Sequence, residues 1–144
     1  MHLPLAFTAH VIPGSGRGKH LGVPTMNLAL EDIPENLSDG IYACTVKRTS
    51  DLGRRTSENN QWFSAVMHIG PRPVFQDTRS CEVHVIDDVL LNSPQTITVQ
   101  IIGFLREVRN FPSPHALIEQ MEEDIIAARA MLASHATVSQ EHHP

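Results

Sequence analysis

A run of alternating glycines and cations near the start of the chain is the segment best suited to bind a phosphate. Gly14, Gly16 and Gly18 are interleaved with Arg17 and Lys19. Glycines allow the backbone N–H groups of such a loop to turn inward around an anion, and the two cations add positive charge. Composition alone does not separate this anion-binding loop from an ordinary flexible hairpin turn.

Two common nucleotide-binding motifs do not fit this loop. A Walker A loop requires glycine five residues before the Gly-Lys pair, where the chain has Pro13, and Ser or Thr at the position of His20. A dinucleotide-binding fingerprint that starts at Gly14 requires glycine where the chain has Lys19. The segment that follows contains Pro24 and is expected to be extended, whereas both motifs lead into a helix.

Thr25 and Asn27 form a candidate metal site. They are two residues apart in the extended segment, so their side chains are expected to point the same way. Hydroxyl and amide oxygens are hard ligands of the kind that Mg²⁺ binds, together with water and phosphate oxygens. On spacing alone, however, a pair of residues that closes a turn by hydrogen bonds is the more frequent arrangement.

Glu82 is a candidate general base. In the run from 80 to 85, Ser80, Glu82 and His84 alternate with Cys81, Val83 and Val85, which predicts a strand with one polar and one apolar face. A polar strand face commonly meets only water, so the pattern alone leaves the role of Glu82 open. His84 is suited either to orient that carboxylate or simply to form a hydrogen bond.

The rest of the chain predicts a mainly β domain with one helix. Five β-like runs lack amphipathic helices between them, which favours a small antiparallel barrel or sandwich: Leu5–Ile12, Ile41–Lys47, Trp62–Ile69, Cys81–Ile86 and Thr96–Leu105. A helix is expected from Pro114 to about Ser134, with Ser113 as its N-cap. Its apolar stripe is expected to pack on the barrel: Leu117, Met121, Ile125, Ala128 and Leu132. We expect one domain over 1–136 and a polar tail over 137–144.

Composition narrows the classes of function. The 144 residues carry a net charge of −5, which argues against a nucleic-acid-binding surface, whereas residues 1–30 contain no acidic residue. No apolar run approaches the ~20 residues of a membrane span, and the N-terminus lacks the basic region of a secretory signal. The two cysteines are expected to be reduced in a cytoplasmic protein, and the nine histidines show no zinc-ligand spacing.

The pattern over residues 14–28, G-x-G-R-G-x-x-L-G-x-P-T-x-N-L, resembles the signature of riboflavin kinases. The resemblance continues in order along the chain through D-G-I-Y-A at 39–43, I-G-P-R-P-V-F at 69–75, E-V-H at 82–84, G-F-L-R at 103–106 and N-F at 110–111. Leu117 and Asp124 match the family's terminal helix.

The resemblance implies a six-stranded antiparallel Greek-key β-barrel with a C-terminal α-helix. It also implies ATP-dependent phosphorylation of riboflavin at its 5′-hydroxyl to FMN, with Glu82 as base and Mg²⁺, or alternatively Zn²⁺, on Thr25 and Asn27. The implied nucleotide-binding residues are Gly14, Gly16, Arg17, Gly18, Lys19, Gly22, Pro24, Thr25 and Asn27. An apolar slot for the flavin ring is expected at Phe111, Leu117 and Met121, which are equally suited to the core, and the resemblance adds Arg106 as a flavin contact. The expected partners are riboflavin, FMN, ATP and ADP, bound by a monomer without nucleic acid or membrane.

The chain departs from the family pattern in three places. Glu107-Val108 replaces the usual Pro-Glu, the stretch 88–93 lacks the usual Tyr-Gly turn, and Val74 replaces Thr. No nucleotidyltransferase sequence precedes the matched region, so FAD synthesis is not expected. The alternatives are a non-catalytic flavin- or nucleotide-binding module on the same barrel, and an unrelated barrel that binds a protein partner. Glu82 favours the enzyme, since binding alone requires no base.

Overall fold

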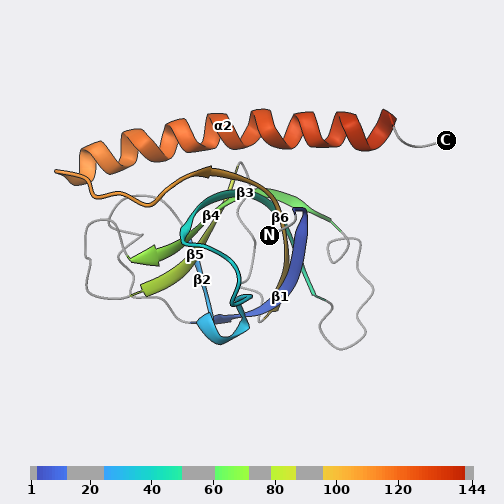
Figure 1. Cartoon of the computed structure of the whole chain (residues 1–144), viewed down its shortest axis with the longest axis horizontal. Helices are drawn as coiled ribbons and strands as arrows, with labels where there is room; N and C mark the ends of the chain where they lie inside the picture. Colours follow the sequence, from blue (N-terminus) through green and yellow to red (C-terminus); the bar gives the residue numbers. More distant parts are fainter. Residues whose placement is uncertain (1–2, 13–24, 50–60, 72–78, 87–95, 142–144) are drawn as a thin grey trace.

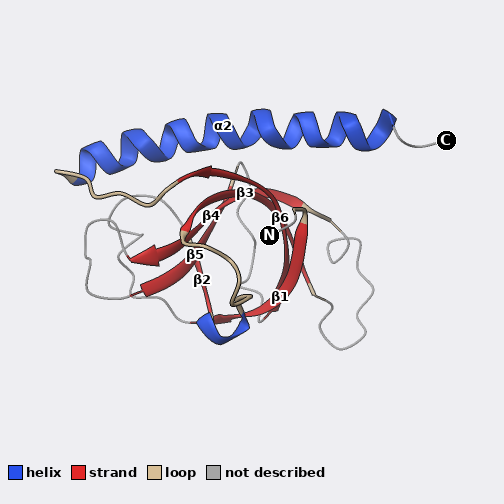
Figure 2. Cartoon of the chain, in the orientation of Figure 1, coloured by secondary structure: helices blue, strands red, loops and turns tan. Residues whose placement is uncertain are grey.

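The computed structural model of the chain describes residues 3–12, 25–49, 61–71, 79–86 and 96–141. These form six antiparallel strands that close into a barrel, with a long helix lying across its outside (Figures 1 and 2). The strands are β1 (Leu5–Ile12), β2 (Met26–Leu28), β3 (Gly40–Arg48), β4 (Phe63–Pro71), β5 (Arg79–Val85) and β6 (Thr96–Arg106), with a 3₁₀ turn η1 (Leu30–Asp32) and the helix α2 (Pro114–Glu141).

The strand order is that of a Greek key. Around the barrel the strands follow one another as β1-β2-β5-β4-β3-β6. Strands β3, β4 and β5 are consecutive neighbours, and β6 returns to pair with β3 on the far side. The fold predicted from the family resemblance is therefore confirmed.

Alternating residues of the strands fill the barrel. The interior includes Tyr42, Met67, Val83 and Ile101, each with no exposed surface. The segment between η1 and β3 adds to this core, since its Ile33 and Leu37 are buried there. Outward-facing positions are consequently free to carry polar side chains over β2, β4 and β5 without disturbing the core.

The helix α2 packs on the outside of the barrel against β3, β4 and β6 (Figure 1). Its Ala128 is fully buried against Ala43 of β3. Ile125 and Leu132 of the predicted stripe pack around that contact, together with Met131, which the stripe did not include. The Ser113 hydroxyl accepts a hydrogen bond from the Ala116 backbone N–H at 3.1 Å, as predicted for the N-cap.

The structure differs from the sequence prediction in two elements. β2 was expected only as an extended segment and is a paired strand, Met26–Leu28. The helix extends to Glu141 rather than ending near Ser134, because continued backbone hydrogen bonding does not require an apolar stripe. Within the described residues, no helix is long and apolar enough to cross a membrane.

Candidate active site

One register row crosses the outer face of the barrel and contains three of the described candidate residues, Asn27, Glu82 and Arg106. Asn27 on β2 pairs with Glu82 on β5, and Glu82 pairs with His68 on β4. His68 in turn pairs with Ile41 on β3, which pairs with Arg106 on β6. We call these five residues the outer row. It crosses four strand spacings of about 4.8 Å, or about 19 Å in all.

Asn27 and Glu82 lie at one end of the outer row. Their sequence neighbours Leu28 and Val83 are in the core, so both side chains point outward, and both are partly buried. Directly opposed residues of antiparallel strands have Cβ atoms about 4.5–5.5 Å apart. The barrel thus brings a candidate metal ligand beside a candidate base, although 55 positions separate them in sequence.

Thr25 and Asn27 have donor atoms that fit magnesium. Thr25 immediately precedes β2 and is partly buried like Asn27. Hydroxyl and amide oxygens suit Mg²⁺, whereas zinc sites in proteins are dominated by nitrogen and sulfur ligands. Within the described part of the chain, no group of three or more His, Cys, Asp or Glu residues could hold a metal ion. Oxygen donors of this kind fit magnesium better than zinc.

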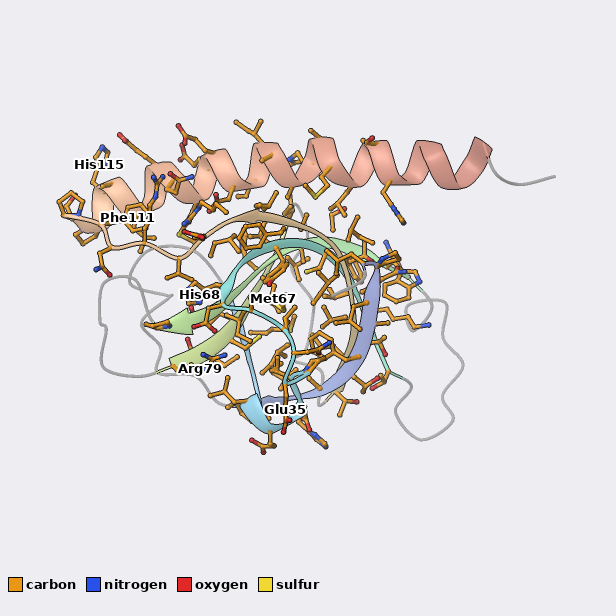
Figure 3. The ribbon with its side chains drawn as sticks, in the orientation of Figure 1. Glu35, Met67, His68, Arg79, Phe111 and His115 are labelled. Carbon is orange, nitrogen blue, oxygen red and sulfur yellow. The ribbon has the colours of Figure 1, made fainter. Side chains whose placement is uncertain are left out.

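His68 was not identified from the sequence. It lies next to Glu82 in the outer row, and its neighbours Met67 and Ile69 point into the core. Figure 3 shows Met67 within the ring of strands and His68 outside it, between Phe111 and Arg79 in this view. Burial lowers the pKa of its imidazole, and the nearby Arg106 acts in the same direction. The available signal was the period-two pattern of the run 62–69, in which His68 is a polar outward position.

The other end of the outer row lies beside the helix. Arg106 donates hydrogen bonds from Nε and Nη2 to the two carboxylate oxygens of Asp124, each at 2.8 Å. The guanidinium carbon lies 5.7 Å from the centre of the Phe111 ring, and that of Arg109 lies 5.6 Å from it. Two guanidinium groups thus lie close to one aromatic ring, and Figure 3 shows that ring, Phe111, beside the first turns of α2.

The four candidate flavin residues lie at this end of the barrel but differ in their contacts and in their exposure. Arg106 and Phe111 are in contact, while Leu117 and Met121 lie on the helix face that also presents Asp124 to Arg106. Leu117 is only 6% exposed, whereas Met121 is partly exposed. Arg106 is held by Asp124, so its first role is to join the helix to β6.

The candidate loop residues lie outside the described residues. These are Gly14, Gly16, Arg17, Gly18, Lys19, Gly22 and Pro24. Their assignment to a nucleotide remains a prediction from sequence. β1 ends at Ile12 and is paired with β2 through Val11–Leu28 and Ile12–Asn27. The strands that precede and follow this segment, β1 and β2, therefore meet beside Asn27.

Comparisons with known proteins identify the family of the chain. The family model "Flavokinase: Riboflavin kinase" matches residues 1–132. The riboflavin kinase of Yarrowia lipolytica is 32% identical over 85% of this chain and 78% of its own length. The human riboflavin kinase is 31% identical over 91% of this chain and 83% of its own length.

Two solved structures share the fold. A macrolide-efflux protein from Streptococcus pneumoniae superposes with a TM-score of 0.70 at 26% sequence identity. The superposition covers 88% of this chain and 38% of the longer efflux protein. The riboflavin kinase of Trypanosoma brucei superposes with a TM-score of 0.56 at 19% identity, covering 90% of this chain and 80% of its own. The second likeness is one of fold alone.

Proposed function

Because the chain belongs to the riboflavin kinase family, we propose that it transfers the γ-phosphate of ATP to the 5′-hydroxyl of riboflavin, giving FMN and ADP. Riboflavin is a substrate that leaves as product, rather than a resident flavin cofactor. The observation that carries the proposal is the pairing of Asn27 with Glu82 at one end of the outer row.

The reaction requires a positioned phosphate, compensation of its charge and a base near the attacking alcohol. The 5′-oxygen of riboflavin forms a bond to the γ-phosphorus of ATP, and the bond between that phosphorus and the oxygen that leaves with ADP breaks. Glu82 accepts the proton that the 5′-hydroxyl loses in this step. Thr25 and Asn27 would hold Mg²⁺, which when bound offsets the negative charge of the phosphate oxygens. Asn27 and Glu82 are one strand spacing apart. A phosphate held near Asn27 would therefore lie next to an alcohol held near Glu82.

The outer row gives riboflavin an orientation. Its reacting end belongs at Glu82, next to the proposed metal ligands, and its ring belongs near Arg106 and Phe111 at the other end. Phe111 offers an apolar ring to the flavin, and the partly exposed Met121 offers a flexible apolar side chain. The loop over 13–24, with its alternating glycines and two cations, is suited to enclose the phosphates of ATP.

We propose a cytoplasmic location for the enzyme. Cys44 and Cys81 are free and buried in the barrel, and burial raises the pKa of the Cys81 thiol to about 12. Such thiols are unreactive and suit a reducing compartment.

The test is incubation of the chain with riboflavin, ATP and Mg²⁺, followed by chromatographic separation of FMN from riboflavin. FMN formation that depends on both ATP and Mg²⁺ supports the proposal. Binding of riboflavin and ADP without any FMN would support the alternative, a binding module on the same barrel. Omission of the metal and replacement of ATP by ADP are the controls.

A further inference from the structure

His68 carries a hydrogen-bonding capacity that the described fold does not use. Both of its ring nitrogens are buried and have no hydrogen-bond partner among the described residues. The Pro71 backbone and Asp39 are near enough to raise its pKa and Arg106 to lower it, yet none of the three meets the distance and angle of a hydrogen bond to either ring nitrogen. A buried polar group without a partner destabilises the fold relative to one that is satisfied. Packing alone therefore does not explain a histidine at this position of β4.

Ser80 has the same property at a neighbouring position. Its hydroxyl oxygen is buried without a partner among the described residues, and the residue is 6% exposed. It lies on the outward face of β5, two residues before Glu82, and pairs with Gly70 of β4. His68 and Ser80 are thus diagonal neighbours across β4 and β5, about 5–8 Å apart at Cβ. Two unused polar groups on one face indicate a ligand rather than an isolated packing defect.

The chemistry of the two groups indicates the kind of ligand. A neutral imidazole presents one N–H donor and one acceptor nitrogen, and a serine hydroxyl also donates and accepts. An alcohol has the matching capacity, since it donates one hydrogen bond and accepts others. A carboxylate or phosphate would only accept, and would leave the acceptor nitrogen of His68 unmatched.

The position of His68 in the outer row indicates which alcohol group it would bind. In the outer row His68 lies between Glu82, where the 5′-hydroxyl reacts, and the Arg106–Phe111 end, where the flavin ring is expected. In riboflavin the segment between those two parts is the ribityl chain, which carries secondary hydroxyls. We propose that His68, assisted by Ser80, binds a secondary hydroxyl of the ribityl chain and so selects a polyhydroxylated acceptor. This inference rests on the proposed function and adds a substrate-binding residue to it.

The test compares two acceptors in three variants. Riboflavin is compared with a flavin whose N10 side chain is 5-hydroxypentyl, which keeps the terminal hydroxyl but lacks the secondary ones. His68→Leu removes the hydrogen bonds and keeps an apolar body, and His68→Asn restores a donor and an acceptor. His10→Leu is the matched control, because His10 lies on β1 outside the outer row and pairs with Asp32.

We expect His68→Leu to lower kcat/KM for riboflavin about tenfold, mainly through KM, because one well-placed hydrogen bond contributes roughly that factor. For the hydroxypentyl flavin we expect the same change to have less than about a twofold effect. His68→Asn should recover part of the loss with riboflavin, and His10→Leu should leave both acceptors unchanged. Thermal unfolding without ligand should show His68→Leu to be at least as stable as the parent, since an unused buried polar group has been removed.

Equal losses with both acceptors would overturn the inference, and so would an unchanged KM for riboflavin. A strong loss of thermal stability in His68→Leu would also overturn it, because it would show that the imidazole serves the fold. The proposed function fails separately, if the parent chain forms no FMN. In that case calorimetric binding of riboflavin and of the hydroxypentyl flavin to the same variants decides the role of His68.

Discussion

Asn27 and Glu82 are directly opposed residues of two antiparallel strands, β2 and β5, and both side chains face outward from the barrel. Asn27 lies on a strand of three residues whose position is fixed by β1 on one side and β5 on the other. The separation of the proposed metal ligand and the proposed base is thereby set by backbone hydrogen bonds. Such a separation is less adjustable than one set by two loops, which suits a reaction that depends on positioning.

Replacement of Glu82 by glutamine should lower kcat by about 10²–10⁴, because general-base assistance contributes about that factor. The change keeps the shape of the side chain but removes its ability to accept the proton. We expect the affinities for riboflavin and for ADP with Mg²⁺ to change little. Steady-state kinetics and calorimetric binding provide the measurements. Glu119→Gln on the exposed face of α2 is the matched control.

More than about a tenth of the parent kcat in Glu82→Gln would contradict the base role, provided that single-turnover measurements show chemistry to limit the rate. Loss of riboflavin binding in the same variant would instead indicate that Glu82 holds the acceptor.

Replacement of Asn27 by alanine should weaken binding of ADP with Mg²⁺ much more than binding of riboflavin. The reason is that an oxygen ligand of the proposed metal site is lost, while the rest of β2 keeps its pairing. Calorimetric titration with ADP at several Mg²⁺ concentrations measures both the affinity and its metal dependence. Asn36→Ala is the control, because Asn36 is exposed in the segment between η1 and β3.

Thr25→Ala should show the same selective loss. Parent-like nucleotide affinity and metal dependence in both Thr25→Ala and Asn27→Ala would refute the metal assignment. A loss of nucleotide affinity that is independent of Mg²⁺ would refute it as well, and would assign the two residues to the nucleotide itself.

Sequence alone was sufficient for the long strands and for the helix face, because their patterns are local. The alternation around Glu82 predicted which side of β5 is polar, and the stripe from Leu117 to Leu132 predicted which side of α2 is buried. β2 was too short to be distinguished from an extended loop. The outer row was not predictable, because its register depends on strand pairs that are distant in sequence. His68 was missed for that reason, since only its place beside Glu82 makes it notable.

The ion pair between Arg106 and Asp124 should contribute strongly to stability. Both side chains are largely buried, at 18% and 7% exposure, and Asp124 also accepts a hydrogen bond from Gln120 at 3.1 Å. Asp124→Asn leaves the guanidinium without its counter-charge, so we expect the free energy of unfolding to fall by about 3–5 kcal/mol. Urea denaturation monitored by circular dichroism measures this change.

The exposed pair of His115 and Glu119 on the same helix is the comparison for that experiment. Removing it through Glu119→Gln should change the free energy of unfolding by less than about 1 kcal/mol. The double change of Arg106→Met with Asp124→Leu should recover much of the stability lost in Asp124→Asn, since an apolar pair needs no counter-charge. A double variant no more stable than Asp124→Asn would show that the loss comes from packing rather than from the unpaired charge.

The stability of the protein should fall as the pH falls below about 6.5, and His68 should account for part of that fall. Burial lowers the pKa of His68 from its ordinary value of 6.5, and Arg106 adds to this effect, while Asp39 and the Pro71 backbone oppose it less strongly. The unfolded chain takes up a proton at His68 near pH 6.5, whereas the folded chain does so only at lower pH. Between the two pKa values the unfolded state binds more protons, so the free energy of unfolding decreases as the pH decreases.

His68→Leu removes the contribution of His68 to the pH dependence of the free energy of unfolding. It leaves the other charged groups around that position in place, including Glu82, Asp39 and Arg106. Urea unfolding of the parent and of the variant from pH 5 to pH 8 isolates this contribution as the difference between their free energies of unfolding. That difference should be constant above about pH 7 and should shift in favour of the variant as the pH falls below 6.5. A difference that stays constant across the whole range would contradict a lowered pKa at His68, and a shift in favour of the parent would mean that the folded state instead stabilises the imidazolium.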